Sequence, residues 1–285
     1  MKKKLIALDM DGTFLTSNKE IPQENFNAVK QAIEAGHEVM ICSGRPHKSL
    51  LSFLSDEGLA DLPVSASNGT ITVVEGEVIN IASMNPESVE NLTKWLDLNK
   101  IPFNLYTTDG VFMHAEFVER AQTAQKEIDS DKVTFFMDIE MIKNYLIKIG
   151  AVKFSHFKDL PQNIKVLKFF IYTPNLKTKH KVYDYANKII GLTVTSSFGD
   201  NVEISDFFGH KGTGIKAVAK HLGIDLKDTI AMGDNYNDLG MLEVAGLAIA
   251  MENAEPEIKE IADIITLSND ECGVAHAIRK HILEL

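Results

Sequence analysis

The amino-acid sequence predicts an α/β protein in which a doubly wound parallel sheet is interrupted by a second, α+β module. Short apolar strands alternate with amphipathic helices over residues 1–83, and the alternation returns over residues 191–285. Such alternation is typical of βαβ units in a parallel sheet. We therefore expect a discontinuous core of 1–83 and 191–285 with an inserted module of 84–190. Two or three consecutive domains are the alternative, but the three strands expected in the first segment would make a thin sheet alone.

The first segment contains three expected strands, each followed by polar residues and glycine. In chain order the expected elements are a strand over residues 4–9, a helix over 22–34, a strand over 37–42, a helix around 50–54 and a strand over 63–67. Pro22 at its start and Gly36 at its end mark the first helix. Ligands of open α/β sheets bind at the carboxyl ends of the strands. The residues that follow these strands are therefore candidate site residues.

The middle segment has a different pattern, and the last segment returns to the first one. Thr107-Thr108-Asp109-Gly110 between two apolar runs indicates a β-hairpin. The middle segment is expected to contain a helix from 85 to 95, strands over 103–106, 111–114 and 166–172, and a helix over 178–190. The last segment is expected to contain strands over 229–232, 247–250 and 264–267, and helices over 238–244, 256–262 and 274–281.

Composition narrows the class of protein. The chain has 285 residues, 45% of them hydrophobic, and a net charge of -11, which disfavours nonspecific binding to nucleic acid and offers no basic face to a membrane. Cys42 and Cys272 have neither metal-ligand spacing nor a disulfide pattern, so a reducing cytoplasm is expected. Acids interrupt the first apolar run too early for a usual signal peptide. No stretch approaches the length that spans a bilayer.

Two acids follow the first strand closely, in Asp9-Met10-Asp11-Gly12-Thr13. The period of two in a strand sends Asp9 and Asp11 to the same side. Two like charges this close repel each other, and a divalent cation or a raised pKa on one acid relieves the repulsion. A strand followed by an ordinary Asx turn is the plainer interpretation.

Other strand ends complete a set suited to phosphate chemistry, which needs a nucleophile, a metal and groups that hold phosphoryl oxygens. Mg²⁺ takes one or two carboxylates, and Asp9 and Asp234 suit that role, with the backbone carbonyl of Asp11 as a further oxygen. Ser43, the amide of Gly44 and Lys211 suit the phosphate. Taken singly, Ser43-Gly44-Arg45-Pro46 is also a plausible turn and Lys211 a plausible solvated lysine, and no Walker sequence is present.

The combined motifs resemble those of the haloacid dehalogenase-like superfamily, and in particular its Cof-type sugar-phosphatase branch. The matching segments, in order, are Asp9-Met10-Asp11-Gly12-Thr13, Ser43-Gly44-Arg45, Asn68-Gly69, Lys211-Gly212, Gly233-Asp234-Asn235-Tyr236-Asn237-Asp238 and Ser268-Asn269-Asp270 with Gly273-Val274. The resemblance implies a Rossmann-like core and a large α/β cap that selects the substrate. One departure is Phe207-Phe208-Gly209-His210 before Lys211, where the aromatic rings would wall the pocket or pack under the cap.

The resemblance also implies roles for several of the matching residues. Asp9 attacks phosphorus and becomes an aspartyl-phosphate, while Asp11 protonates the leaving alcohol and then deprotonates water, so Asp11 must be able to hold a proton. The groups that would bind the phosphoryl oxygens are Ser43, Lys211, Asn237 and the backbone amide of Met10. The implied Mg²⁺ ligands are Asp9, Asp11 and Asp234. Asp238 would orient either a coordinated water or Lys211.

Three functions remain open on the sequence. The first is a Mg²⁺-dependent phosphatase of small phosphorylated metabolites such as sugar phosphates. The second is a phosphomutase that moves phosphate between sugar positions, and the third is a protein that binds phosphate without catalysis. In each case the expected partner is a small phosphorylated molecule, and the protein is expected to be a monomer or a small homo-oligomer.

Overall fold

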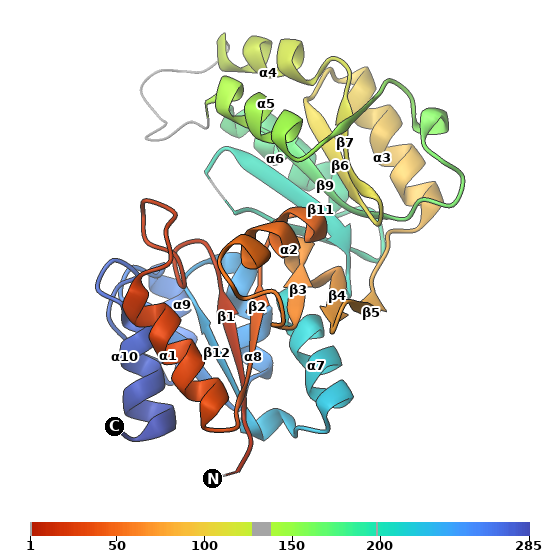
Figure 1. The fold of residues 1–285 in the computed structure, drawn as a ribbon. Helices are drawn as coiled ribbons and strands as arrows, with labels where there is room; N and C mark the ends of the chain where they lie inside the picture. Colours follow the sequence, from red (N-terminus) through yellow and green to blue (C-terminus); the bar gives the residue numbers. More distant parts are fainter. Residues whose placement is uncertain (1, 127–137, 198) are drawn as a thin grey trace. The chain divides into compact units, whose positions relative to one another are not determined.

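The computed structural model describes residues 2–126, 138–197 and 199–285. The chain folds into two compact units, one of residues 1–81 and 210–285 and the other of residues 82–209. Each unit is built on its own β-sheet (Figure 1). Among the described residues, no helix is both long and apolar enough to cross a lipid bilayer.

The described residues of the first unit form an eight-stranded sheet with the order β14-β13-β12-β1-β2-β3-β4-β5. Its strands are β1 (Leu5–Asp9), β2 (Glu38–Cys42), β3 (Val64–Ala66), β4 (Ile71–Val74), β5 (Glu77–Ile81), β12 (Thr229–Gly233), β13 (Leu247–Ala250) and β14 (Ile264–Ile265). Neighbouring strands from β14 to β3 run parallel. The first four residues of β1 are fully buried, as expected for a parallel sheet covered on both faces.

The sheet is larger than the sequence predicted, because β4 and β5 extend it as an antiparallel hairpin. Their connection is Glu75-Gly76, and both of these residues have a positive φ. Two residues of positive φ make the tight turn that suits the twist of a hairpin. Glutamate is uncommon in such a turn, which explains why the pattern is not evident in the sequence.

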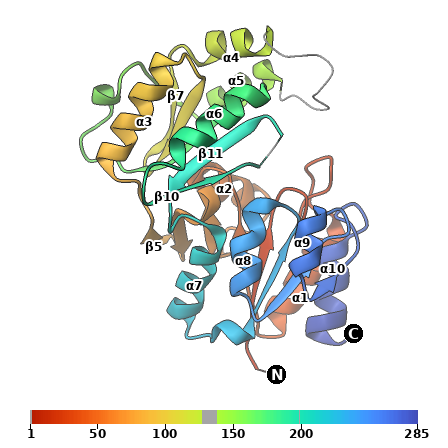
Figure 2. The same ribbon diagram turned by 180° about the vertical axis from the view of Figure 1, so that it is seen from behind.

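Helices cover both faces of this sheet, which confirms the predicted doubly wound core. They are α1 (Gln23–Glu34), α2 (His47–Asp56), α7 (Lys211–Leu222), α8 (Leu239–Val244), α9 (Pro256–Ile261) and α10 (Gly273–Ile278), the last continued by a π-helical turn over Arg279–Leu283. On one face α1 packs beside α10, and on the opposite face α7 packs beside α8 (Figures 1 and 2).

The described part of the second unit contains a six-stranded sheet of order β10-β11-β9-β6-β7-β8, antiparallel except for β7 and β8. Its strands are β6 (Phe103–Thr107), β7 (Gly110–His114), β8 (Val152–Phe154), β9 (Val166–Tyr172), β10 (Leu192–Thr195) and β11 (Asn201–Asp206). Its helices are α3 (Pro86–Leu98), α4 (Phe117–Lys126), α5 (Ile139–Lys148) and α6 (Leu176–Ala186). Alternate residues of β9 enter two apolar clusters: Phe169 and Ile171 pack with α3 and α6, and Phe170 and Tyr172 with α4 and α5. The unit is thus α+β.

The boundary expected after residue 190 differs from the observed one. Residues 192–206 form β10 and β11, which pair with each other and with β9 in the second sheet. Val202 and Ile204 of β11 are buried in the cluster of α3 and α6, so burial of apolar side chains ties this hairpin to the second unit. Residues 191–209 therefore belong to that unit rather than to the first one.

The position of Cys42 in the middle of the first sheet gives a direct test of this fold. The Cys42 side chain is buried, whereas Cys272 is partly exposed, and both are free thiols. Burial raises the pKa of Cys42 to about 12, so its reactive thiolate is scarce at neutral pH. We expect a thiol reagent such as Ellman's to label only Cys272 in the native protein and both thiols in urea. Equally rapid labelling of both in the native state would contradict the buried position of Cys42.

Candidate active site

Three strands of the first unit deliver the predicted site residues to one edge of the sheet. β1 lies between β2 and β12, with Asp9 beside Cys42 and Leu8 beside Met232. Because these strands are parallel and in register, the chain segments that follow them leave the sheet together. Asp9, Ser43 and Asp234 therefore occupy neighbouring strand ends, the place where α/β sheets bind ligands.

A fully buried lysine lies at the centre of these strand ends. Lys211 is the first residue of α7, and its Nζ donates to Oδ1 of Asp9 and, at 2.5 Å, to Oδ1 of Asp238. Asp238 is also fully buried, and Asp9 is only 5% exposed. Burial alone would lower the pKa of Lys211, but the charges of Asp238 and Asp9 outweigh it and raise that pKa. Lys211 is therefore a permanent buried cation.

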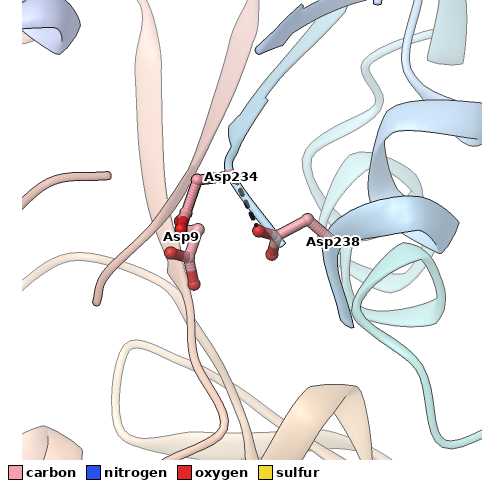
Figure 3. Close-up of side chains that lie close together, drawn as sticks. All are labelled: Asp9, Asp234 and Asp238. Atoms are coloured by element: carbon pink, nitrogen blue, oxygen red, sulfur yellow. Dashed lines mark hydrogen bonds between the residues drawn. The ribbon is translucent and has the colours of Figure 1, made fainter. Parts of the chain in front are cut away.

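Asp238 links this lysine to the turn that follows β12. Its Oδ2 accepts hydrogen bonds from the backbone N–H groups of Asp234 at 2.9 Å and Asn235 at 3.0 Å. Figure 3 shows its carboxylate directed at the start of that turn. Both oxygens of Asp238 are thus engaged, one by Lys211 and one by the backbone. This placement matches the predicted contact of Asp238 with Lys211.

Asp9 and Asp234 have the arrangement that a divalent cation requires. Carboxylate oxygens of Asp9, Asp234 and Asp238 lie within 4.8 Å of one another (Figure 3). Burial, followed by the charge of Asp238, raises the pKa of Asp9 well above its usual range and that of Asp234 to about 6. Thr13 donates from Oγ1 to Oδ1 of Asp234 at 2.9 Å and orients it. Since Asp238 is occupied, the pair Asp9 and Asp234 fits Mg²⁺, which takes one or two carboxylates.

The side chain of Asp11 has cationic partners of its own and is not part of the acidic cluster of Asp9, Asp234 and Asp238, so of this residue only the backbone carbonyl stays a predicted metal ligand. Arg45 donates to it twice, from Nε at 3.0 Å and from Nη2 at 2.8 Å, and Lys19 donates from Nζ at 3.0 Å. Strand β1 ends at Asp9, so the period of two no longer applies at Asp11. Burial alone would raise the pKa of Asp11, but Arg45 and Lys19 outweigh it and lower that pKa to about 2. The carboxyl is therefore ionised, not protonated as a general acid must be.

Two of the predicted phosphate-binding residues, Ser43 and Gly44, follow the end of β2 and contact the turn after β3. The Ser43 carbonyl accepts from the N–H of Asn68 at 2.9 Å, and the Ser43 hydroxyl accepts from the N–H of Arg45 at 3.2 Å. Asn237 donates from Nδ2 to Oδ1 of Asn68 at 3.4 Å. These contacts connect the turn of Ser43 and Gly44 with the turn that carries Asn237. Met10, whose backbone amide is the predicted ligand group, is fully buried as a residue.

The sequence interpretation missed three side chains of this site. The motifs of the sequence include Arg45 but predict no role for it, and they predict none for Lys19 or Thr13. Arg45 had a usable signal, because a cation directly after a strand end faces whatever acids follow the neighbouring strand. Lys19 and Thr13 lie in the loop after β1, whose path the sequence pattern does not predict. Phe207 and Phe208 are 59% and 65% exposed, and their rings contact each other edge to face.

Comparison with known proteins agrees with this geometry. The family model of haloacid dehalogenase-like hydrolases matches residues 6–278. The phosphatase YwpJ of Bacillus subtilis is 32% identical, with 98% of this chain and 100% of YwpJ covered. The 5-amino-6-(5-phospho-D-ribitylamino)uracil phosphatase YwtE of the same organism is 34% identical, with 96% of each chain covered. A solved haloacid dehalogenase-like hydrolase from Bacillus subtilis superimposes with a TM-score of 0.82 at 29% identity, covering 98% of this chain and 99% of that one.

The matches span nearly the whole chain, including the described strand ends and the inserted second unit. Their names agree with a site that combines a buried carboxylate, a lysine and a cation-binding pair of acids. The chain therefore belongs to the haloacid dehalogenase-like hydrolases, in their Cof-type branch, and is a phosphatase of that family.

Proposed function

We propose that this phosphatase hydrolyses phosphate monoesters of small metabolites with Mg²⁺, through an aspartyl-phosphate on Asp9. The observation that carries the proposal is the setting of Asp9. Its carboxylate is held by the buried ammonium of Lys211 and lies beside Asp234 in an acidic cluster of the size that one cation occupies. A buried carboxylate with both a fixed cation and room for a metal is suited to attack phosphorus.

The reaction then takes two steps. In the first, an oxygen of Asp9 bonds to phosphorus, the bond from phosphorus to the alcohol oxygen breaks, and that oxygen takes a proton from Asp11. In the second, a water oxygen bonds to phosphorus and gives its proton to Asp11, the bond between phosphorus and Asp9 breaks, and inorganic phosphate leaves. Splitting the hydrolysis in this way replaces one difficult displacement by two easier ones.

The remaining residues bind the metal and the negatively charged phosphoryl oxygens during both steps. Asp9, Asp234 and the backbone carbonyl of Asp11 are the proposed Mg²⁺ ligands. When bound, Mg²⁺ supplies positive charge against the transferring phosphoryl group. The other phosphoryl oxygens fall to Ser43, the amides of Met10 and Gly44, Lys211 and Asn237. Asp238 keeps Lys211 in position through their hydrogen bond.

Proton transfer through Asp11 requires a change from the described arrangement. Arg45 and Lys19 hold this carboxylate ionised, and an ionised carboxylate cannot protonate the leaving alcohol. A phosphate monoester brings anionic oxygens, and a guanidinium binds these in the same bidentate way as it binds a carboxylate. On our proposal, Arg45 and Lys19 both exchange from Asp11 to the anionic oxygens of the substrate, which frees Asp11 for its proton.

The names of the relatives indicate the class of substrate, and the second unit bears on whether the protein is a mutase. YwtE is named for a substrate with a phosphorylated ribityl chain, which favours sugar and polyol phosphates here.

A mutase, unlike a phosphatase, needs a second basic site for phosphate. Lys168 of β9 is buried, but its Nζ donates to the buried Glu203 at 3.0 Å, which neutralises it. This pairing makes Lys168 itself a poor second phosphate site. The two free thiols support a cytoplasmic location, and we expect a monomer or a small homo-oligomer.

Substitution of the proposed nucleophile gives the first test. Asp9→Asn keeps the shape of the side chain but removes the attacking oxygen's charge. We expect Mg²⁺-dependent turnover of p-nitrophenyl phosphate to fall by at least about a thousandfold, as for other nucleophile substitutions. Asp56→Asn, an exposed acid at the end of α2, is the control and should leave turnover unchanged. Substantial activity in Asp9→Asn would exclude Asp9 as the nucleophile.

The raised pKa of Asp234 predicts that Mg²⁺ binding depends on pH. Because this pKa is about 6, the carboxyl gains a proton below that pH, and a metal must displace the proton. The dissociation constant of Mg²⁺, measured by titration calorimetry, should rise by at least about tenfold per pH unit below 6, because Asp234 and also Asp9, whose pKa is raised, must lose their protons to bind the metal. Asp234→Asn should bind Mg²⁺ weakly at every pH. A dissociation constant that is the same at pH 5 and pH 7 would contradict this assignment.

A further inference from the structure

The loop that follows β1 is held in part by asparagine side chains from other segments of the chain. Its backbone carbonyls at three positions each accept a hydrogen bond from an asparagine amide. The pairs are Asn253 with Gly12 at 2.9 Å, Asn25 with Phe14 at 3.1 Å, and Asn269 with Leu15 at 2.9 Å. Such bonds satisfy backbone groups that have left regular secondary structure. They also decide where the loop carrying Asp11 lies.

Asn253 differs from the other two asparagines because its own loop also contacts Asp234. It belongs to the short connection between β13 and α9. In the same connection, the N–H of Glu255 donates to the backbone carbonyl of Asp234 at 2.9 Å. One short loop therefore binds both segments that carry the proposed metal ligands, the segment of Asp11 and Gly12 and the segment of Asp234.

The carbonyl that Asn253 holds belongs to a residue wedged against Asp234. Gly12 has a φ of 95°, and a Cβ on it would collide with the Asp234 carboxylate. The next residue, Thr13, donates from Oγ1 to that same carboxylate. A shift of the Gly12 peptide therefore moves the backbone of Asp11 on one side and disturbs the orientation of Asp234 on the other.

The amide of Asn253 is oriented for this contact and has little part in the core. Its Nδ2 donates to Gly12, while its Oδ1 accepts from the N–H of Asn269 at 2.9 Å, so both ends of the amide are engaged. Its side chain is nevertheless exposed. Hydrogen bonds at an exposed position contribute little to folding stability. Stability alone is therefore a poor explanation for this pair of contacts.

We propose that Asn253 is a positioning residue for phosphoryl transfer. Its amide holds the Gly12 peptide so that the backbone of Asp11 and the carboxylate of Asp234 keep the separation that one Mg²⁺ requires. The inference rests on the proposed function for its catalytic consequence, but its consequence for Mg²⁺ binding stands apart from turnover.

The test compares two exposed residues that each make two hydrogen bonds and that both contact the loop after β1. Asn253→Ala should lower kcat on p-nitrophenyl phosphate on the order of tenfold, because displacing a reacting group by even 1 Å costs up to about a hundredfold. KM should stay within about twofold, and the dissociation constant of Mg²⁺ by calorimetry should rise several-fold. The melting temperature should change by no more than about 2 °C, as is usual for surface substitutions.

Asp270→Ala is the matched control. The Asp270 carboxylate is exposed and accepts from the N–H of Ser17 at 2.8 Å and from its Oγ at 2.7 Å, farther along the loop from Gly12. This variant should keep kcat and Mg²⁺ affinity within about twofold of the wild type. Equal losses in both variants, or wild-type Mg²⁺ affinity in Asn253→Ala, would overturn the inference. If the wild-type protein fails to turn over substrate, the proposed function fails, and the calorimetric comparison still decides the role of Asn253.

Discussion

The buried ammonium of Lys211 is the interaction on which the rest of the site depends. Removing the carboxylates of Asp9 and Asp238 from water without a partner costs on the order of several kcal/mol each. Lys211 compensates both, although it lies at the amino end of α7, where the helix dipole disfavours a cation. The buried charge of the lysine is thus stabilised by the two acids, just as their charges are stabilised by the lysine. The end of β1, the turn after β12 and the start of α7 must come together for any of the three charges to be tolerated.

Near this lysine, the pKa values of Asp9 and Asp11, which are close in the sequence, are shifted in opposite directions. Burial and nearby carboxylates raise the pKa of Asp9, whereas Arg45 and Lys19 lower that of Asp11. Catalysis needs the reverse, an ionised Asp9 and a protonated Asp11. On the proposed function, the two ligands of the reaction supply the reversal. Mg²⁺ beside Asp9 and Asp234 favours their charged forms, and an anionic substrate that binds Arg45 and Lys19 releases Asp11.

Local patterns predicted the core well because they reflect local physics. The strands over 166–172 and 247–250 match the structure residue for residue, and the predicted strand ends converge as parallel topology requires. Contacts that depend on the path of irregular loops were not predictable. The Asp11–Arg45 pair exists because the chain leaves β1 at Met10, and Asn253 meets Gly12 across 241 residues of sequence. The hairpin of β10 and β11 was missed because its alternation does not say which sheet it joins.

The covalent step is the central claim, and trapping it tests that claim most directly. Acid added during steady turnover of p-nitrophenyl phosphate should stop the reaction with part of the protein phosphorylated, since acyl phosphates survive acid better than base. Peptide mass mapping should then place one phosphoryl group on Asp9, and hydroxylamine should remove it. Rapid turnover with no phosphorylated protein, or a phosphoryl group on any residue other than Asp9, would contradict the account.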